Sequence, residues 1–566
     1  DLHPRVRRQR QMCIRDRAYT EDKNREHFTT YRIKLTKRVL HSESRFSGKK
    51  SFYTLTITLV FALALASCKQ GNRHKNLTTE AFSEIKEPLF VINSSNVRRL
   101  LIGKCESIHT GLLADNRVKQ YYTDGGKMMW VNKFGVSNGA YRLLEHLKAN
   151  VGAMKLSEDA FFITLIEEDM KRMHQLDFDT ENNTINHVLA RLEYHLMRAY
   201  TRYAVGQRYG FTNPNYTFNR LDSILTNDST RRFRGYRLLY DLKSERPDDS
   251  FLNTLIVKIA ADSVAQYLEE IQPDDGLYKS LLAMLPTATE KQRMRIIANM
   301  ERCRWRYDKA DLKNGKTVVV NIPEFRLYAY DNGRCVDNMK VGCGATKTKT
   351  PILHSMIERI ELNPQWHIPM SIITHDIVRH AGDTAYFNRN NYYIVDRETG
   401  EELSPTRVSA SMLRSGNYRV SQRGGEGNSL GRIIFRFKNN MSVYLHDTNS
   451  RGFFNRDIRA ISHGCVRVER PFDLAKFVLG DSADEWTYDK IRISMDLPPE
   501  TDRGKRYVKA NPDGERRLIS NKAVSPAIPV HILYFTMFPD AGGNIVSHPD
   551  IYGYDDVIMR GMRPYL

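Results

Sequence analysis

The spacing of apolar residues changes once along this chain, at Lys316, and this change constrains the fold more than any other feature. From 91 to 312, apolar residues recur every three or four positions, as in 192–203. This is the period of helices that bury one face. After Lys316, the segments 317–322 and 325–330 are rich in β-branched and aromatic residues and flank a short turn, as in a hairpin. The sequence therefore predicts an α+β chain in which a helix-rich domain precedes a mostly β domain.

The β-rich domain is expected to span 313–500 and to contain a second hairpin, formed by 433–437 and 441–446 around a Lys-Asn-Asn turn. Between the two hairpins, 366–425 is polar, rich in Tyr, Asn and Gly, and has little apolar area for a core of its own. We expect this segment to be an insertion that acts as a lid over a cleft. The remaining residues, 501–566, are expected to form a C-terminal extension that packs on the β-rich domain.

Composition narrows the class of protein. The chain has 566 residues, of which 41% are hydrophobic and 27% charged, and these fractions exclude collagen-like, low-complexity and wholly disordered chains. The net charge of +20 is concentrated at the start, because residues 1–67 hold 15 Lys and Arg against 6 Asp and Glu. The mild excess elsewhere favours an anionic polymer or surface. The sequence contains no basic stripe interleaved with aromatic residues, the pattern that would indicate binding of nucleic acid.

The beginning of the chain has two parts. Residues 1–48 are rich in arginine and lack an apolar period, so we predict that they are non-native sequence or a disordered leader. Residues 49–67 begin with two lysines and continue with an uncharged apolar run. This run is short for a helix that spans a bilayer, which needs about 20 residues, but it is typical of the apolar region of a secretion signal. We therefore expect the rest of the protein to be exported.

The apolar run ends in Leu-Ala-Ser-Cys at residues 65–68, which resembles the lipobox of bacterial lipoproteins. The resemblance implies that Cys68 carries a lipid and that 68–90 is a polar tether to the membrane. A simple secretion signal followed by an incidental cysteine is the alternative interpretation.

The strongest chemical signal is the pair formed by His446 and Cys465. Tyr444 and His446 share one face of the predicted second strand of the hairpin. Cys465 follows after an eighteen-residue interval in the sequence Ser-His-Gly-Cys-Val-Arg. A thiol is a nucleophile only as a thiolate, and an adjacent imidazole commonly generates one near neutral pH. The pattern therefore predicts cysteine-based nucleophilic catalysis.

The residues before the cysteine have predicted supporting roles. Gly464 lets backbone N–H groups approach and hold the oxyanion of a tetrahedral intermediate. Ser462 and His463 are predicted to set the tautomer of the base by hydrogen bonding. Two other interpretations of Cys465 are a zinc ligand, for which the set lacks the usual three or four ligands at recognisable spacing, and an inert buried thiol.

The interval from His446 to Ser462-His463-Gly464-Cys465 resembles the signature of the L,D-transpeptidases of bacterial peptidoglycan. Further segments are similar to the long, scaffold-bearing subfamily of Gram-negative cells. They are Val320-Asn321-Ile322-Pro323, Val341-Gly342 with Thr350-Pro351, Asn363-Pro364 with Trp366 and Pro369, Asn428 with Leu430-Gly431, Leu445-His446-Asp447-Thr448, and Pro529-Val530-His531-Ile532. The resemblance is specific over about 316–500 and 528–555, and weak over 91–312. It implies a helical scaffold domain followed by an L,D-transpeptidase catalytic domain.

The resemblance also implies a reaction. Cys465 attacks a donor tetrapeptide stem at the carbonyl of the L-centre of meso-diaminopimelate and releases D-alanine. An amine of a second stem then takes the acyl group to give a 3→3 crosslink. His446 matches the general base and acid, while Gly464 and Cys465 match the oxyanion donors. The positions that line the substrate groove are matched by Tyr444, Trp366 and Arg467. No metal or organic cofactor is implied, and carbapenems are expected to acylate the thiol in the periplasm.

Several alternatives share the same residues. Water in place of the acceptor amine makes the protein an L,D-carboxypeptidase or a crosslink hydrolase, and another amine or a protein can serve as acceptor. A non-catalytic lipoprotein that binds peptidoglycan is disfavoured because the whole signature is present. The sequence leaves open the acceptor, the start codon, the membrane leaflet, the oligomeric state and a disulfide between Cys335 and Cys343.

Overall fold

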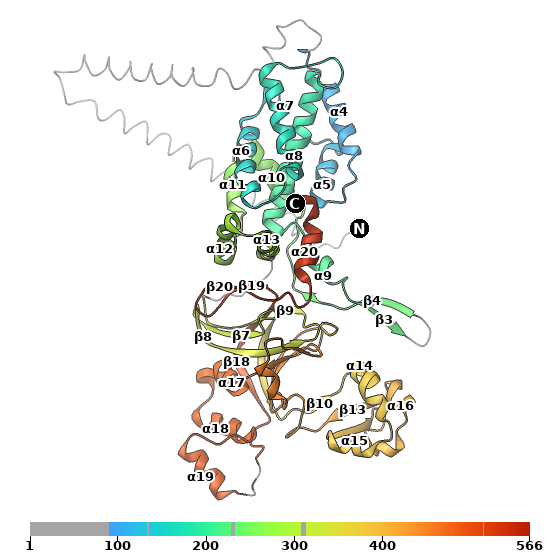
Figure 1. Ribbon diagram of the computed structural model, residues 1–566, viewed down its shortest axis with the longest axis vertical. Helices are drawn as coiled ribbons and strands as arrows, with labels where there is room; N and C mark the ends of the chain where they lie inside the picture. Colours follow the sequence, from blue (N-terminus) through green and yellow to red (C-terminus); the bar gives the residue numbers. More distant parts are fainter. Residues whose placement is uncertain (1–89, 133–134, 228–231, 307–312, 513, 515) are drawn as a thin grey trace, which may run out of the picture. The chain divides into compact units, whose positions relative to one another are not determined.

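The computed structural model describes residues 90–566 except for 133–134, 228–231, 307–312, 513 and 515 (Figure 1). The predicted leader, the signal segment with Cys68 and almost all of the predicted tether lie outside these residues. Within the described part of the chain, no helix combines the length and apolarity needed to cross a membrane. The described residues have the predicted α+β character, with helices before β6 and a large sheet after it.

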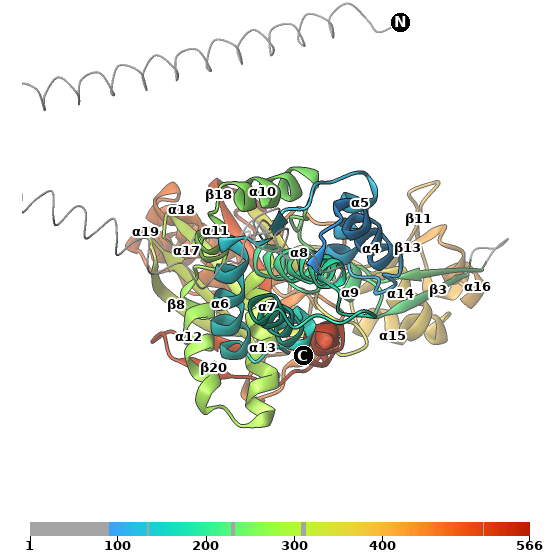
Figure 2. The same cartoon turned by 90° about the horizontal axis from the view of Figure 1, so that it is seen from above.

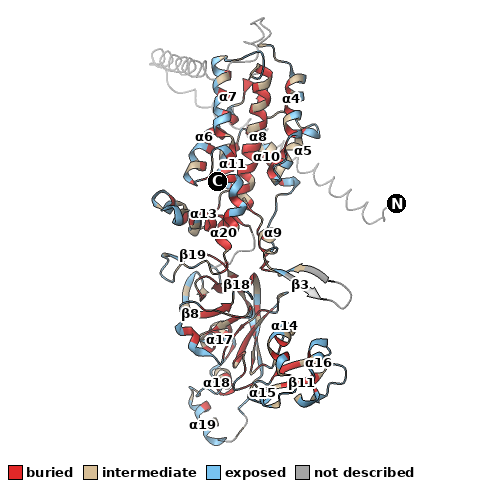
Figure 3. Cartoon of the chain, turned by 45° about the vertical axis from the view of Figure 1, so that its right-hand side comes forward, coloured by how far each residue is buried: buried red, intermediate tan, exposed pale blue. Residues whose placement is uncertain are grey.

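The helical region is organised around one long helix, α8 (Ile185–Tyr209), which is buried on nearly all sides (Figures 2 and 3). Thr184 caps its N-terminus by accepting a hydrogen bond from the N–H of His187, and Gly210, with φ of +88°, follows its last turn. Helices α4, α5, α6, α7 and α13 pack against it. The helices of this region are α4 (Ser94–Glu106), α5 (Leu113–Thr123), α6 (Asn138–Ala153), α7 (Ile163–Gln175), α9 (Pro214–Phe218), α10 (Asp249–Ala260), α11 (Val264–Glu270), α12 (Gly276–Met284) and α13 (Glu290–Arg304).

Two small strand pairs interrupt these helices, and neither was predicted. They are β1 (Val131–Asn132) with β2 (Gly135–Val136), and β3 (Ser223–Asn227) with β4 (Arg232–Tyr236). Strand β5 (Tyr240–Asp241) then joins the edge of the large sheet beside β9. Segments that precede Lys316 in the sequence therefore contribute directly to the β-rich part.

The large sheet is a ring of strands in the order β14-β15-β17-β8-β7-β6-β18-β9, closed because β14 also pairs with β9. The buried apolar residues of its strands belong to a continuous core that also includes the helical region, and strands such as β6 are buried along almost their whole length. The strands are β6 (Lys316–Asn321), β7 (Arg326–Asp331), β8 (Arg334–Gly344), β9 (Ile352–Leu362), β14 (Ile433–Phe437), β15 (Leu445–His446), β17 (Val466–Val468) and β18 (Asn521–Leu533), while β16 (Ala460–Ser462) pairs with β8. Both predicted hairpins are present, although β15 is shorter than expected.

We expected residues 501–566 to form an extension that packs on the β-rich domain, but this segment contributes a strand to the large sheet and a helix to the helical region. Strand β18 lies inside the sheet between β6 and β9, and α20 (Tyr554–Met562) packs against α13 of the helical region. Two prolines in β18, Pro526 and Pro529, obscure its strand pattern, because proline is normally confined to edges and bulges. Pro526 lies at a bulge of this kind, because the register of β18 against β9 shifts between Ala523 and Ile528. Helices α17 (Pro471–Leu479), α18 (Glu485–Ser494) and α19 (Asp502–Ala510) precede this strand.

The insertion over 366–425 has a core of its own, so the expectation of little apolar area was wrong. It contains a sheet in the order β10-β13-β11-β12 and three short helices. Its apolar residues are dispersed over short elements rather than gathered in a run, which concealed them in the sequence. The cluster consists of Ile368, Ile372, Ile373, Ile377, Val378, Phe387, Ile394, Val408, Leu413 and Val420. The elements are β10 (Trp366–His367), α14 (Met370–Ile372), α15 (Thr384–Arg389), β11 (Tyr392–Asp396), β12 (Glu402–Leu403), α16 (Ala410–Ser415) and β13 (Tyr418–Gln422).

Candidate active site

The sheet brings His446 and Cys465 to the same groove. Strands β15 and β17 run parallel, with Leu445 opposite Val466 and His446 opposite Arg467. Cys465 immediately precedes β17. Both side chains line a groove of about 730 Å³. The eighteen-residue interval in the sequence is therefore the crossover that joins two adjacent parallel strands, which places the thiol and the imidazole at neighbouring strand positions.

The segment 462–465 is a tight loop held by its own hydrogen bonds. The hydroxyl of Ser462 donates to the carbonyl oxygen of Cys465 (2.6 Å), and the N–H of Gly464 donates to the same hydroxyl oxygen (3.1 Å). Gly464 has φ of +123°, a conformation that residues with a Cβ rarely adopt. A glycine is therefore required for backbone geometry here. Ser462 organises the loop rather than the base, and His463 is exposed at the rim of the groove.

The base is oriented by backbone carbonyl groups. Nδ1 of His446 lies within hydrogen-bond distance of the carbonyl oxygen of Asp447, which can only accept, so the proton sits on Nδ1 and Nε2 is left as the basic nitrogen. This replaces the predicted role of Ser462 and His463 in setting the tautomer. Gly431, with φ of +66°, lets the chain pass close to Asp447, because a Cβ there would lie 2.5 Å from its side chain.

The imidazole is neutral at neutral pH. Burial, together with the nearby positive charge of Arg467, lowers the pKa of His446 to about 4, against the opposing effect of the carbonyl groups of Asp447 and Leu430. The side chain is only 3% exposed. A neutral imidazole with a free nitrogen can accept a proton from the thiol.

The thiol is also uncharged before substrate binds. Burial raises the pKa of Cys465 above its ordinary value, while the N–H of Tyr444 and the charges of Arg467 and Arg436 oppose that rise. The Sγ lies 3.7 Å from the carbonyl oxygen of Ser442, to which it donates a weak hydrogen bond. The lowered pKa of His446 and the raised pKa of Cys465 favour a neutral pair, in which the thiol proton moves to His446 during attack, over a preformed thiolate.

The other described cysteines do not line this groove. Burial raises the pKa of the Cys105 thiol to about 11 and that of the Cys343 thiol to about 12. Cys335 and Cys343 are both free and lie on the same strand, β8, eight residues apart. That spacing corresponds to about 26 Å along an extended strand. A disulfide between them is therefore excluded within one chain of this fold.

The walls of the groove are aromatic and cationic. Tyr444 and Trp366 line it, with Trp366 supplied by β10 of the insertion. The Nε of Arg467 is buried and has no hydrogen-bond partner among the described residues, and burial lowers the pKa of its guanidinium. Arg436 stacks on the ring of Tyr444 at 4.6 Å and pairs with Glu361 at 2.8 Å. Such a lining suits a peptide that carries carboxylates.

Sequence reasoning assigned no role to several residues that line the groove, among them Arg436, Ser442 and Tyr392. Arg436 and Ser442 belong to the predicted hairpin, but their roles depend on which way the strand ends face. Tyr392 also lines the groove from the insertion, and no local motif marks it. The described residues include no cluster of three or more His, Cys, Asp or Glu side chains that could hold a metal ion.

A thiol, a neutral imidazole and a groove with cationic and aromatic walls are the components of a cysteine-nucleophile site. Residues 315–511 match the family described as the L,D-transpeptidase catalytic domain, and residues 116–285 match the family described as the Scaffold domain. The chain therefore carries an L,D-transpeptidase catalytic domain preceded by a Scaffold domain.

A relative from Haemophilus influenzae, with the printed name "Putative L,D-transpeptidase", is 29% identical over 324 residues. The aligned part is 55% of this chain and 60% of the relative. The match to the Scaffold domain lies within the helical region and covers fewer residues than the 91–312 that periodicity suggested.

Proposed function

We propose that this protein is a cysteine acyltransferase that forms 3→3 crosslinks between peptidoglycan stem peptides. The single observation that carries the proposal is the juxtaposition of Cys465 and His446 on neighbouring strands in one groove. The match of residues 315–511 to the L,D-transpeptidase catalytic domain suggests the substrate class. The groove supports it, because Arg467 and Arg436 can receive the carboxylates of diaminopimelate and D-alanine.

The acylation step follows from the arrangement of the two side chains. Nε2 of His446 accepts the thiol proton as Sγ of Cys465 bonds to the carbonyl carbon of the L-centre of diaminopimelate. The N–H of Gly464 is occupied by Ser462, so we assign the oxyanion chiefly to the N–H of Cys465, with Gly464 setting the direction of the loop. The C–N bond then breaks, and the imidazolium returns its proton to the amine of the departing D-alanine.

Deacylation reverses these roles. The side-chain amine of diaminopimelate on a second stem attacks the thioester carbonyl and gives a proton to His446. The C–S bond breaks, the new amide forms, and the thiolate recovers the proton from the imidazolium. Trp366 from the insertion and Tyr444 from the sheet would hold the peptide between them, and 366–425 would act as a lid.

The location of the protein is part of the proposal. The apolar run that ends at Cys68 supports export to the periplasm and a lipid anchor on that cysteine. An anchored enzyme would reach the peptidoglycan through the polar tether over 68–90. Metabolic labelling with a lipid precursor, comparing the wild type with Cys68→Ala, tests the anchor independently of catalysis.

Incubation with a disaccharide-tetrapeptide followed by mass spectrometry tests the activity. A dimer at the mass of the 3→3 product, with release of D-alanine, is expected. Tripeptide alone would instead indicate hydrolysis of the thioester, and absence of turnover would indicate a protein that only binds peptidoglycan. Intact-mass analysis with a carbapenem should show one adduct, at Cys465. An adduct at Cys105, Cys303, Cys335 or Cys343 would mean that the nucleophile is misassigned.

A further inference from the structure

A turn formed by residues 344–350, called here the Thr350 turn, holds the catalytic loop 462–465 from behind. The hydroxyl of Thr350 is fully buried. It donates to the carbonyl oxygen of Gly464 (2.9 Å) and accepts from the N–H of Gly344 (2.8 Å). The hydroxyl of Thr348 and the N–H of Ala345 both donate to the carbonyl oxygen of Ser462, at 2.8 and 2.9 Å. Two carbonyl groups of the loop before the nucleophile, those of Ser462 and Gly464, are therefore held by one turn.

Pinning the carbonyl of Gly464 also fixes the N–H of Cys465. The two groups belong to the same peptide unit, which is planar and trans, so the direction of one determines that of the other. The hydrogen bond from Thr350 directs this carbonyl toward the turn, and consequently the N–H of Cys465 is directed away from it. The N–H that is assigned to the oxyanion is thus aimed by a hydroxyl that touches neither substrate nor thiol.

The Thr350 turn is stabilised by hydrogen bonds to Tyr552. This residue lies outside the residues 315–511 that match the catalytic domain. The Tyr552 hydroxyl donates to the carbonyl oxygen of Gly344 (2.6 Å) and accepts from the N–H of Thr350 (3.1 Å), joining the two ends of the turn. Its ring stacks on that of Tyr534 at 5.4 Å, and its own N–H donates to the Tyr534 hydroxyl (2.8 Å).

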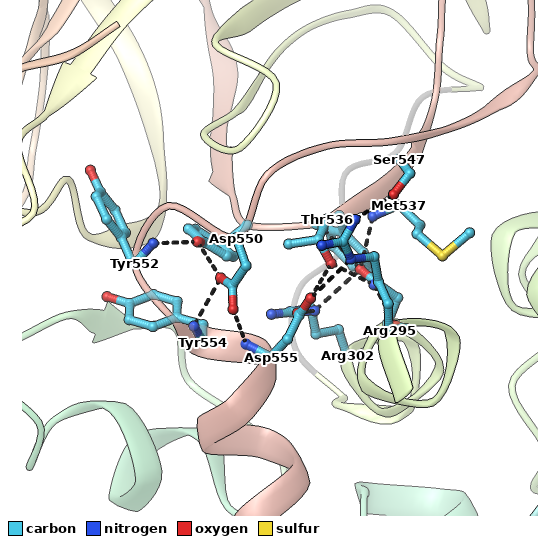
Figure 4. A network of polar contacts seen from close by, with 12 residues as sticks. Arg295, Arg302, Thr536, Met537, Ser547, Asp550, Tyr552, Tyr554 and Asp555 are labelled. Atoms are coloured by element: carbon cyan, nitrogen blue, oxygen red, sulfur yellow. Dashed lines mark hydrogen bonds and ion pairs between the residues drawn. The ribbon is translucent and has the colours of Figure 1, made fainter. Parts of the chain in front are cut away.

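Polar contacts connect Tyr534, and through it Tyr552, to the helical region. The hydroxyl of Tyr534 donates to Asp550 (2.6 Å), which accepts from the N–H of Asp555 (2.8 Å). Asp555 forms an ion pair with Arg302 of α13 at 2.6 Å, a contact visible in Figure 4. On the other side of the turn, Lys349 pairs with Asp222 of the helical region at 2.7 Å. Segments outside the catalytic domain therefore hold both sides of the Thr350 turn.

We propose that Thr350 and Tyr552 are positioning residues for the oxyanion donor at Cys465, and that the C-terminal segment completes the active site through them. The inference rests on the proposed acyl-transfer function. It predicts a specific defect, because only reactions that pass through an oxyanion need the N–H to be aimed. Alkylation of the same thiol forms no oxyanion and should not depend on it.

The test compares two reactions of Cys465 in the full-length protein: acylation by a carbapenem and alkylation by iodoacetamide, both followed by intact mass. Thr350→Val keeps the shape and removes the hydroxyl, whereas Thr350→Ser retains it. We expect Thr350→Val to lower the acylation rate by about ten- to a hundredfold. Alkylation should stay within about twofold, and Thr350→Ser should restore most of the acylation rate.

Tyr552→Phe gives an independent variant if Thr350→Val does not fold, and it should show the same selective loss of acylation. Tyr328→Phe is its matched control, since this buried hydroxyl bonds Glu324 and has no contact with the Thr350 turn. Equal loss of both reactions, or acylation at the wild-type rate in both Thr350→Val and Tyr552→Phe, would overturn the inference. A wild-type protein that is alkylated but never acylated would instead contradict the proposed function.

Discussion

The buried charge cluster around Asp115 in the helical region and the buried polar groups of the groove are paired to different extents. In the helical region, Arg198 and Arg202 both pair with Asp115, each at 2.6 Å. Every guanidinium nitrogen of these two arginines has an acceptor, with Tyr194 and the carbonyl of Ala160 completing the set. Burial alone would raise the pKa of Asp115, but the two arginines lower it to about 2.

The groove leaves its buried polar groups incompletely paired. Nε of Arg467 has no partner among the described residues, and the imidazole of His446 is engaged by carbonyl oxygens that leave Nε2 basic. A buried polar group without a partner costs free energy, so a fold retains it where something else completes the pairing. The contrast separates charges that hold the structure from charges that await a substrate.

The largest effect is expected from the nucleophile itself. Cys465→Ala should lower crosslinking by at least about a thousandfold, because no other described thiol lines the groove. The free energy of unfolding should change little, since the side chain is small and lies at the edge of the groove. Product mass and a denaturant titration measure the two quantities. A rate within about tenfold of the wild type would contradict the assignment.

The opposite behaviour is expected from Asp115→Ala, which leaves Arg198 and Arg202 buried without a counter-charge. We expect a loss of about 3–5 kcal/mol in the free energy of unfolding, with carbapenem acylation of the folded protein unchanged. Asp249→Ala is the control, because its pairing with Arg117 is exposed and should contribute less than about 1 kcal/mol. Equal losses in the two variants would remove the distinction between the regions.

The pH dependence of acylation provides a third comparison. His446 acts as a base only when neutral, and its pKa of about 4 means that acylation should fall only as the pH drops through about 4. Arg467 helps to hold that pKa down, so Arg467→Gln should move the acid limb to higher pH. A loss of about tenfold in kcat/KM for the tetrapeptide is expected in addition. An unmoved acid limb would show that Arg467 does not act on the base.

The smallest effect is expected in the insertion. Removing 376–415 would cut through its apolar cluster, so Trp366→Ala is the sharper change. We expect KM for the tetrapeptide to rise by about three- to tenfold, with alkylation of Cys465 unaffected.

Hydrogen exchange should show amides of 366–425 that slow once the acyl-enzyme forms. Unchanged exchange and unchanged KM would make the insertion a surface decoration.

Much of the architecture could be predicted because it depends on local patterns. The change of period at Lys316 and both hairpins follow from residue spacing. Strand β18 escaped prediction because its prolines break the strand pattern. The apolar cluster of 366–425 escaped it because its members are dispersed over several short elements and the loops between them. In both cases the burial of a residue depends on partners far away in the sequence, which no local window contains.

The sequence by itself determined the chemistry of this protein: a cysteine after glycine, a histidine before it, and an interval that suits a crossover between strands. Only the tertiary structure decided how these groups are held. The Asp447 carbonyl sets the tautomer of His446, and Thr350 and Tyr552 pin the loop of Cys465 from segments about 115 and 87 residues away. Reactive groups are specified by residue type, whereas their orientation depends on hydrogen bonds from side chains to backbone carbonyl groups, and no local sequence pattern marks those pairings.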